Sequence, residues 1–532
     1  MDDLVIRGAD VVDGTGTPAR RVDVAVRDGR IAAIGPGARP ARRVVDATGY
    51  VLAPGFIDIH THSDFTLPLN PRAEGKIRQG VTTEVLGNCG YSAAPALPGR
   101  AEELRDYLAA SAPWLPFRET TFAGYLDSFP PTSVNTVMQV GHNTLRLMAM
   151  HMENRPARAA ELAVMERLLE EALDAGALGL SSGLFTAPGS YAGPDELIAL
   201  GRVLSRHGGA YASHIRNEAG LVFEAVDEAI ALGETCGVHV QIAHLKLSGT
   251  ENWGGAGRLL ARIDAARRRG VAVDCDQYPY TTATNPLRNL LPVWIQDGGL
   301  AAMLDRLGDR AVRDRVRTDL RTRGYGSFGH LPSWDAVRVA ISPNQPEHAG
   351  QTIGEIARAR GADPLDAACE YLVADEGHTR VIMTAMAEDD VQEILRSPAV
   401  LVGSDGTALA TYGVTGQGKP HPRCYGTFPR VLGHYVRALG LLSLPEAIRK
   451  MTGASAAALG LVERGLIQEG FQADLCVFDP ALIADRATYD EPHRYAAGVV
   501  LVVVNGTVVI DAGEHTGALP GRVLRRGPRG VA

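Results

Sequence analysis

Short apolar segments alternate with longer segments of helical composition through the middle of the chain. Most of the short segments are rich in β-branched residues, as buried strands are, whereas Ala, Leu, Arg and Glu dominate the segments between them. The pattern predicts eight strands, at residues 55–62, 81–87, 135–142, 177–183, 210–217, 238–246, 271–279 and 399–406. Strands that alternate with helices form a parallel sheet, and eight of them can close on themselves. We therefore expect an α/β fold with a (β/α)8 TIM-like barrel.

The two ends of the chain follow a different pattern. Residues 1–54 and 462–520 contain short β-branched runs separated by Gly and Asp turns, which is typical of antiparallel strands. We expect both ends to form one small β-sandwich domain, with the barrel at 55–461. The interval between the last two barrel strands far exceeds the dozen or so residues that a crossover needs. This excess predicts an inserted lid or small domain at about 281–345.

Composition narrows the class of protein. With 532 residues, 45% of them hydrophobic and 21% charged, the chain is globular and too long for a single core. A formal net charge of −8 leaves no basic surplus, so we expect no nucleic-acid partner. No apolar run approaches the length of a membrane span, and the acidic start does not resemble a signal peptide. Six scattered cysteines without a CxxC pair favour a reducing compartment, so a cytoplasmic location is expected.

Four histidines and one aspartate lie where the expected strands end. His60 and His62 close the first strand, and residues two apart on a strand point to the same face. His214 and His244 lie at the ends of the fifth and sixth strands, and Asp405 follows the eighth. Barrel enzymes assemble their active sites at these carboxyl ends, so the five residues together predict a metal site.

The residue types fit amide hydrolysis. Imidazoles hold Zn²⁺ while leaving one position for water, whose pKa then falls to about 7, and the resulting hydroxide can attack an amide carbonyl. Asp405 can act as the general base and then as the general acid that protonates the leaving nitrogen. Cys89 follows the second strand at the same end, where a thiolate could bridge two metals, although a buried free cysteine is the alternative.

Several motifs resemble the D-aminoacylase (N-acyl-D-amino-acid deacylase) family of the amidohydrolase superfamily. They are GFIDIHTH, GVTTEVLGNCGYSAAP, SHIRNE, AHLKLSG, QYPY, VGSDG and HPRCYGTFPRVLG. The resemblance implies that Cys89 takes the place of the carboxylated lysine of hydantoinases and forms a tight zinc site with His214 and His244. It further implies a second, weaker zinc site formed by His60 and His62, with Cys89 as the bridge.

The resemblance also implies roles in catalysis and substrate binding. Asp405 matches the catalytic aspartate of the family, and Arg423 matches the arginine that grips the α-carboxylate of the substrate, a task suited to a bidentate guanidinium. Tyr278 matches a tyrosine that helps to hold this carboxylate, and Lys246 a lysine near the metals. Where the family has a serine, this chain has Thr284, whose methyl group narrows the pocket, and the loop between Asp405 and Arg423 is longer.

The expected reaction is therefore zinc-dependent removal of the acyl group from an N-acyl-D-amino acid, a small-molecule substrate. One alternative is a deacylase of another modified amide. Another is a cyclic-amide or dipeptide hydrolase of the hydantoinase, dihydroorotase or isoaspartyl type, but the expected fourth strand, ALGLSSGL, lacks the lysine of that class. A non-catalytic scaffold should have gaps in the ligand set, and here every position is filled. The D configuration rests on the resemblance alone.

Overall fold

The computed structural model describes residues 1–36 and 40–532. Its centre consists of parallel strands, each inside a segment where the sequence predicts one. They are β6 (Phe56–Asp58), β7 (Val81–Leu86), β8 (Asn135–Met138), β9 (Val140–Gly141), β10 (Gly179–Gly183), β11 (Ala210–His214), β12 (Val240–Ile242), β13 (Val273–Gln277) and β17 (Val400–Val402). The expected strand positions are confirmed, and β8 and β9 divide the third segment between them.

The parallel strands follow one another in chain order. β6, β7 and β8 form one ladder, and β9 continues into a six-stranded sheet that ends with β13 and β17. The segments that follow the first and the last strand also meet, because Thr61 and Gly406 form a parallel bridge and the Asp405 amide donates to the His60 carbonyl at 2.8 Å. This contact brings residues from opposite ends of the strand order into one region.

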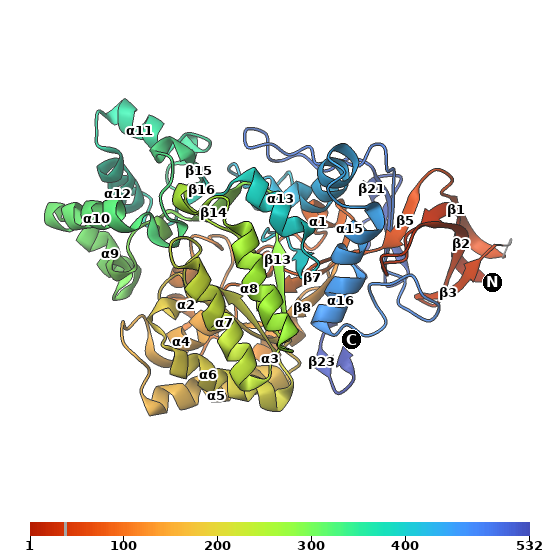
Figure 1. Ribbon diagram of the computed structural model, residues 1–532, viewed down its shortest axis with the longest axis horizontal. Coiled ribbons are helices and arrows are strands. Elements are labelled where there is room, and N and C mark those ends of the chain that lie inside the picture. Colours follow the sequence, from red (N-terminus) through yellow and green to blue (C-terminus); the bar gives the residue numbers. More distant parts are fainter. Residues whose placement is uncertain (37–39) are drawn as a thin grey trace.

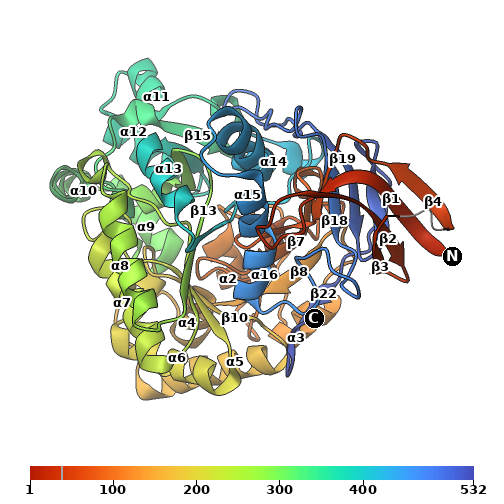
Figure 2. The same cartoon turned by 45° about the vertical axis from the view of Figure 1, so that its right-hand side comes forward.

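Amphipathic helices cover the strands on the outside, as Figures 1 and 2 show for α5–α8. α6 (Pro194–His207) illustrates why they form: proline occupies its first turn, two acids follow, and Gly208 ends it with a φ of 64°. Its buried leucines recur at helical spacing and pack onto the core. The other helices of this part are α1 (Glu74–Ile77), α2 (Ala101–Leu108), α3 (Phe122–Ser128), α4 (His142–Met150), α5 (Ala159–Asp174), α7 (Val222–Cys236), α8 (Ala256–Arg268), α13 (Glu388–Arg396), α14 (Arg423–Arg430), α15 (Leu444–Met451) and α16 (Gly453–Leu459).

Both ends of the chain share a nine-stranded sheet with its own apolar core. The N-terminal part supplies β1 (Asp2–Val11), β2 (Arg20–Arg27), β3 (Arg30–Gly35), β4 (Ala41–Asp46) and β5 (Val51–Pro54). The C-terminal part supplies β18 (Leu475–Phe478), β19 (Val499–Val504), β20 (Thr507–Asp511) and β21 (Glu514–His515). β5 and β18 pair antiparallel and join the two parts. Near the end of the chain, β22 (Val523–Leu524) runs parallel to β8, and β23 (Arg526–Gly527) pairs with β24 (Gly530–Val531).

A smaller unit is inserted between β13 and β17. Its antiparallel sheet has the order β14 (Thr282–Pro286), β16 (Arg380–Thr384) and β15 (Val337–Ile341). Its helices are α9 (Gly299–Gly308), α10 (Arg310–Arg323), α11 (Ile353–Arg360) and α12 (Pro364–Ala374). In Figure 1 these helices lie at the opposite end of the molecule from the nine-stranded sheet. The inserted sheet extends to Thr384, past the boundary expected near 345, because the partner of β14 is β16.

Two expectations about the chemical class can be compared with this structure. All six cysteines are free thiols in this structure, and all six side chains are buried. Among the described residues, no helix has both the length and the apolar content that crossing a bilayer requires.

Candidate metal centre

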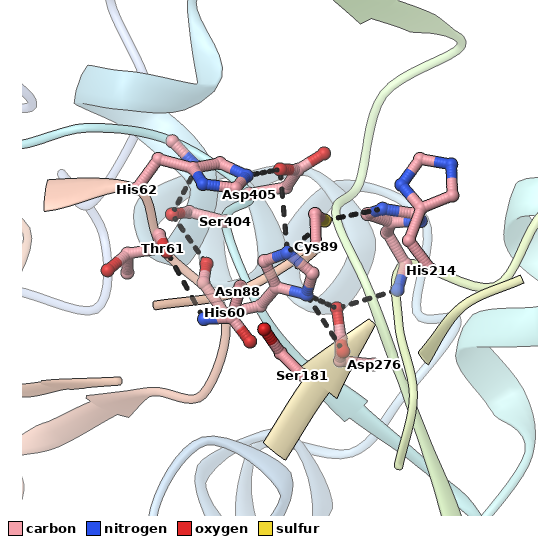
Figure 3. A network of polar contacts seen from close by, with 12 residues as sticks. His60, Thr61, His62, Asn88, Cys89, Ser181, His214, Asp276, Ser404 and Asp405 are labelled. Carbon is pink, nitrogen blue, oxygen red and sulfur yellow. Dashed lines mark hydrogen bonds and ion pairs between the residues drawn. The ribbon is translucent and has the colours of Figure 1, made fainter. Parts of the chain in front are cut away.

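The residues that the sequence predicts as metal ligands come together at the ends of the parallel strands. Two groups of donor atoms, each within 4.8 Å of one another, share Cys89. One group is His60, His62, Cys89 and Asp405, and the other is Cys89, His214 and His244. Cys89 Sγ lies 3.3 Å from His60 Nε2 and 3.4 Å from His244 Nε2, so the thiol is wedged between two imidazoles (Figure 3).

The turn Gly87-Asn88-Cys89-Gly90 aims the thiol at this centre. Gly87 and Gly90 have φ values of 75° and 77°, and a Cβ on either would lie 2.1–2.2 Å from an oxygen atom, so both positions require glycine. The Asn88 amide donates to the carbonyls of Thr61 and Val85 at 3.2 and 3.0 Å. These bonds pin the turn to the ends of β6 and β7, and Cys89 itself is held at a φ of 55°.

Asp276, at the end of β13, organises the buried side of the centre (Figure 3). Its carboxylate lies 3.2 Å from His60 Nδ1 and accepts hydrogen bonds from Gln241 Nε2 at 2.6 Å and the His244 amide at 2.9 Å. A proton on His60 Nδ1 leaves Nε2 to face the thiol, the arrangement of a metal-bound histidine. The sequence analysis missed Asp276, although it lies two residues before Tyr278 in the expected seventh strand.

His214 is the strongest sign that the pocket accommodates a metal. It is buried, and its ring stacks on Phe185 with centroids 3.7 Å apart. Neither ring nitrogen makes a hydrogen bond among the described residues, and the nearest carboxylate, Glu218 Oε1, lies 3.4 Å from Nε2. Leaving such buried polar atoms unpaired is costly, and a metal bond relieves that cost. Burial also holds the pKa of His214 and His244 well below the usual value, so both rings are neutral and can donate a lone pair.

Cys89 needs a metal to become a thiolate. Burial raises the pKa of its thiol to about 11, although the neighbouring His60 acts in the opposite direction. A bound cation displaces such a proton, because the ligand is the deprotonated sulfur. Neutral imidazoles beside a thiol are donors that suit zinc, and the residues present therefore fit this metal.

Asp405 faces the same centre from the segment after β17. Its Oδ1 lies 3.2 Å from His62 Nε2 and 3.6 Å from His60 Nε2. Burial alone would raise its pKa, but the positive charge of Arg423 dominates the opposing contributions and holds the pKa well below the usual value. Asp405 is thus ionised, the state that a general base requires. Cys89, His244 and Asp405 all have positive φ, so backbone strain concentrates at this site.

Arg423 and Tyr278 lie beside Asp405. Arg423 begins α14, is 2% exposed, and stacks over the Tyr278 ring with its guanidinium carbon 4.6 Å from the ring centroid. Its amide donates to His421 Nδ1 at 3.0 Å, and this bond fixes the first turn of the helix. The Tyr278 hydroxyl and Arg423 Nε are buried without hydrogen-bond partners among the described residues. Both therefore have donors available for an anion.

Lys246 and Thr284 occupy different positions around the centre. Lys246 Nζ lies 2.5 Å from Glu218 Oε1 and 2.6 Å from His244 Nδ1. Glu218, like Asp276, was not among the site residues predicted from the sequence. Glu218 follows His214 by four residues in the SHIRNE motif, which was the available signal. Thr284 lies on β14 of the inserted unit and lines the site cavity.

The cavity above these residues is small, about 30 Å³, which corresponds to one water molecule. Metal-ligand candidates, aromatic side chains and residues of the inserted unit line it; they are His62, Cys89, Tyr91, Ser111, Phe185, His214, His244, Thr284, Asn285, Pro286, Arg380, Asp405 and Arg423. A substrate must therefore displace side chains when it enters. Arg380, which comes from β16 of the inserted unit, is a third residue that the sequence analysis did not single out.

Comparison with known proteins agrees with this geometry. The sequence profile of the amidohydrolase family matches residues 43–510. The solved structures of a D-hydantoinase and of the L-hydantoinase from Arthrobacter aurescens each match 99% of this chain. Their sequence identities are 15% and 17% and their TM-scores 0.56 and 0.53, so the similarity concerns the fold alone. The class that fold and site define is a metal-dependent amidohydrolase.

More similar proteins place the chain within that class. A D-aminoacylase and an N-acyl-D-aspartate deacylase from Alcaligenes xylosoxydans xylosoxydans are each 40% identical to it, over 98% and 99% of this chain and 98% and 95% of theirs. A solved structure shows an N-acyl-D-glutamate deacylase from Bordetella bronchiseptica in complex with zinc and a phosphonate mimic of the tetrahedral intermediate. Its sequence is 38% identical to this chain, the TM-score is 0.83, and the match covers 98% of this chain and 99% of that one. The chain therefore belongs to the amidohydrolase family, in its D-aminoacylase group.

Proposed function

We propose that the protein is a zinc-dependent deacylase that hydrolyses N-acyl-D-amino acids to the free D-amino acid and a carboxylic acid. The observation that carries the proposal is the position of Arg423, whose guanidinium lies 2.9 Å from Asp405 beside the cluster of donors around Cys89. A carboxylate-binding group next to a hydrolytic centre suits a substrate whose scissile amide is one carbon away from a carboxylate. The 40% identity to a D-aminoacylase supports the D configuration.

The donor groups suggest how zinc would be held. Cys89, His214 and His244 would form the tight site, and His60 and His62, with Cys89 shared, a second and weaker one. A solved D-aminoacylase of 38% identity is described as having a binuclear centre with one-metal activation and second-metal attenuation. When bound, zinc polarises the amide carbonyl and lowers the pKa of a water molecule to about 7.

The remaining steps belong to the side chains of the protein. Asp405, ionised and 3.2 Å from His62 Nε2, accepts the proton of the attacking water at a carboxylate oxygen and delivers it to the leaving nitrogen. Arg423 takes the α-carboxylate of the substrate in place of Asp405, and Tyr278 donates its free hydroxyl to the same group. Thr284 borders the acyl amino acid from β14. Lys246 donates to Glu218, whose carboxylate lies 3.1 Å from His244 Nδ1 and can hold that ring with Nε2 toward Cys89.

We further propose the architecture that presents this site. The chain order of the parallel strands and the bridge between Thr61 and Gly406 support a closed (β/α)8 barrel over about 55–461. The shared sheet supports a separate β domain from 1–54 and 462–520, and the inserted unit, here extended to Thr384, would act as the lid. Six free, buried cysteines support a cytoplasmic protein.

The hydantoinase alternative finds less support at the fourth strand. β10 has the sequence GLSSG, and Ser181 accepts a hydrogen bond from the Gly90 amide at 3.0 Å, next to Cys89. The bridging lysine of that class therefore has no counterpart on β10, and Cys89 supplies the shared donor instead.

Release of free amine from paired N-acetyl-D- and N-acetyl-L-amino acids tests the proposal. With zinc-loaded enzyme, we expect turnover of the D series only, lost in Asp405→Asn while zinc remains bound. Turnover of the L series, or full activity of Asp405→Asn, would contradict it. Ring opening of hydantoin or dihydropyrimidine without any deacylation would move the protein to the alternative class.

A further inference from the structure

A second arginine from the inserted unit faces the site. Arg380 is the first residue of β16, opposite Pro286 on β14, and lines the same cavity as Asp405 and Arg423. Its Nη1 donates to Ser111 Oγ at 2.7 Å. Among the described residues no carboxylate lies within ion-pair distance of Arg380, whereas Arg423 has Asp405.

The surroundings of Arg380 disfavour its charge. Burial lowers the pKa of its guanidinium to about 10, and the positive charge of Arg423 acts in the same direction. Tyr91, which also lines the cavity, has Arg288 as another cationic neighbour. Arg288 Nη2 donates a hydrogen bond to the Tyr107 carbonyl at 2.8 Å. A partly buried cation on the cavity wall without a matching acid costs stability, and a strongly perturbed pKa beside a cavity is a feature of functional sites.

We propose that Arg380 binds a carboxylate in the side chain of the substrate, so that the preferred substrates are N-acyl-D-amino acids with an acidic side chain. This inference rests on the proposed function, because it specifies the substrate of the same site. It assigns one guanidinium to each carboxylate of a dianionic substrate. The side-chain carboxylate of the substrate then offsets the cost of keeping the Arg380 guanidinium charged in its partly buried position.

The two arginines are not interchangeable in this arrangement. Arg423 contacts Asp405, which acts at the scissile nitrogen, and the α-carboxylate is attached to the carbon that carries this nitrogen. Arg423 is therefore placed for the α-carboxylate. Arg380 enters from the inserted unit, beside the β14 residues Thr284 and Asn285 that line the cavity, where the side chain of a substrate would extend.

Matched pairs of substrates isolate the contribution of Arg380. We would measure kcat/KM for N-acetyl-D-glutamate and N-acetyl-D-glutamine, and for N-acetyl-D-aspartate and N-acetyl-D-asparagine, which differ by one charge at constant shape. The wild-type enzyme should prefer the acids by about 10²-fold or more, because an amide leaves the buried guanidinium without its anion. Arg380→Gln should lower kcat/KM for the acids about 10²-fold and change the amides less than about threefold.

Two further variants distinguish recognition from folding. Arg380→Lys keeps the charge and should keep part of the preference for acids. Arg338→Gln makes the same change on the neighbouring strand β15, where Arg338 pairs with Asp490 at 2.9 Å, and should leave both substrate pairs unaffected. An equal loss for acids and amides in Arg380→Gln, or a wild-type enzyme that prefers the amides, would overturn the inference.

The outcomes also separate this inference from the proposed function. Hydrolysis of neutral N-acyl-D-amino acids without a preference for acids would leave the deacylase in place and remove the role of Arg380. If no N-acyl-D-amino acid is hydrolysed, calorimetry with D-glutamate and D-glutamine on the zinc-loaded protein decides. D-Glutamate should bind at least about tenfold more tightly, and this difference should vanish in Arg380→Gln; equal binding to the wild type would refute the inference.

Discussion

Arg423 Nη1 lies 2.9 Å from Asp405 Oδ2. The arginine that we propose binds the substrate therefore forms an ion pair with the carboxylate that we propose as the general base. The contact couples binding to catalysis, because a substrate carboxylate that engages Arg423 also uncovers Asp405. In the absence of substrate the pair leaves a cavity of about 30 Å³.

Replacing Arg423 should therefore affect both binding and pH dependence. In Arg423→Met we expect KM to rise about 10²-fold through loss of the charge-assisted hydrogen bonds to the substrate. Because the Arg423 charge holds the pKa of Asp405 down, its loss should raise that pKa and move the acidic limb of the kcat/KM profile to higher pH. Profiles measured from pH 4 to 9 test this, and an unshifted acidic limb would show that Arg423 does not influence Asp405.

Loss of Cys89 should remove the shared donor of both candidate metal sites. After dialysis against a chelator, Cys89→Ala should retain much less zinc than the wild type, and its activity should fall at least about 10³-fold. Elemental analysis gives the zinc content. Cys476→Ala, which changes another fully buried cysteine in the nine-stranded sheet, is the matched control and should keep both properties. Full zinc occupancy in Cys89→Ala would refute the role of the thiol.

Asp276 should act as a positioning residue for two histidines. Asp276→Asn weakens the bond to His60 Nδ1 and the hold on the His244 amide, and such changes around a metal typically lower affinity 10–100-fold. Competition with a zinc-binding dye measures the change. Asp274→Asn makes the same substitution two residues earlier on β13, where Asp274 pairs with His239 and Arg267, and zinc affinity should not change. Equal affinities in the two variants would contradict the prediction.

Glu84 should make stability depend on pH. Burial raises the pKa of this β7 carboxyl from 4.5 to about 7, so between these values the folded state holds a proton that the unfolded state has released. Stability from this group is complete below pH 4.5 and is lost as pH rises through 7, an effect of up to roughly 3 kcal/mol. Glu84→Gln should therefore gain stability relative to the wild type between pH 5 and pH 8 in denaturant unfolding. A constant difference between the two proteins would contradict this sign.

The sequence was most informative where function depends on strand ends. His60, His214 and His244 could be placed because each lies at the end of a short segment predicted as a strand, and strand periodicity fixes the face on which side chains lie. Asp276 and Glu218 were missed because a carboxylate that supports a ligand has the same local pattern as an ordinary polar residue. Arg380 left no signal, because its place in the site depends on the pairing of β16 with β14, two segments far apart in the chain.

The pairing of β5 with β18 constrains how this protein is made. β5 ends six residues before His60, and its partner is translated only after the barrel strands and the inserted unit. During synthesis, the backbone groups of β5 that pair with β18 therefore stay unpaired until β18 emerges from the ribosome near the end of translation. Pairing between segments so far apart in the chain is slow. The segment that carries the first proposed zinc ligands thus gains its final support late. A chain whose synthesis stops just before β18 would contain all of the proposed metal ligands and an open sheet edge beside them.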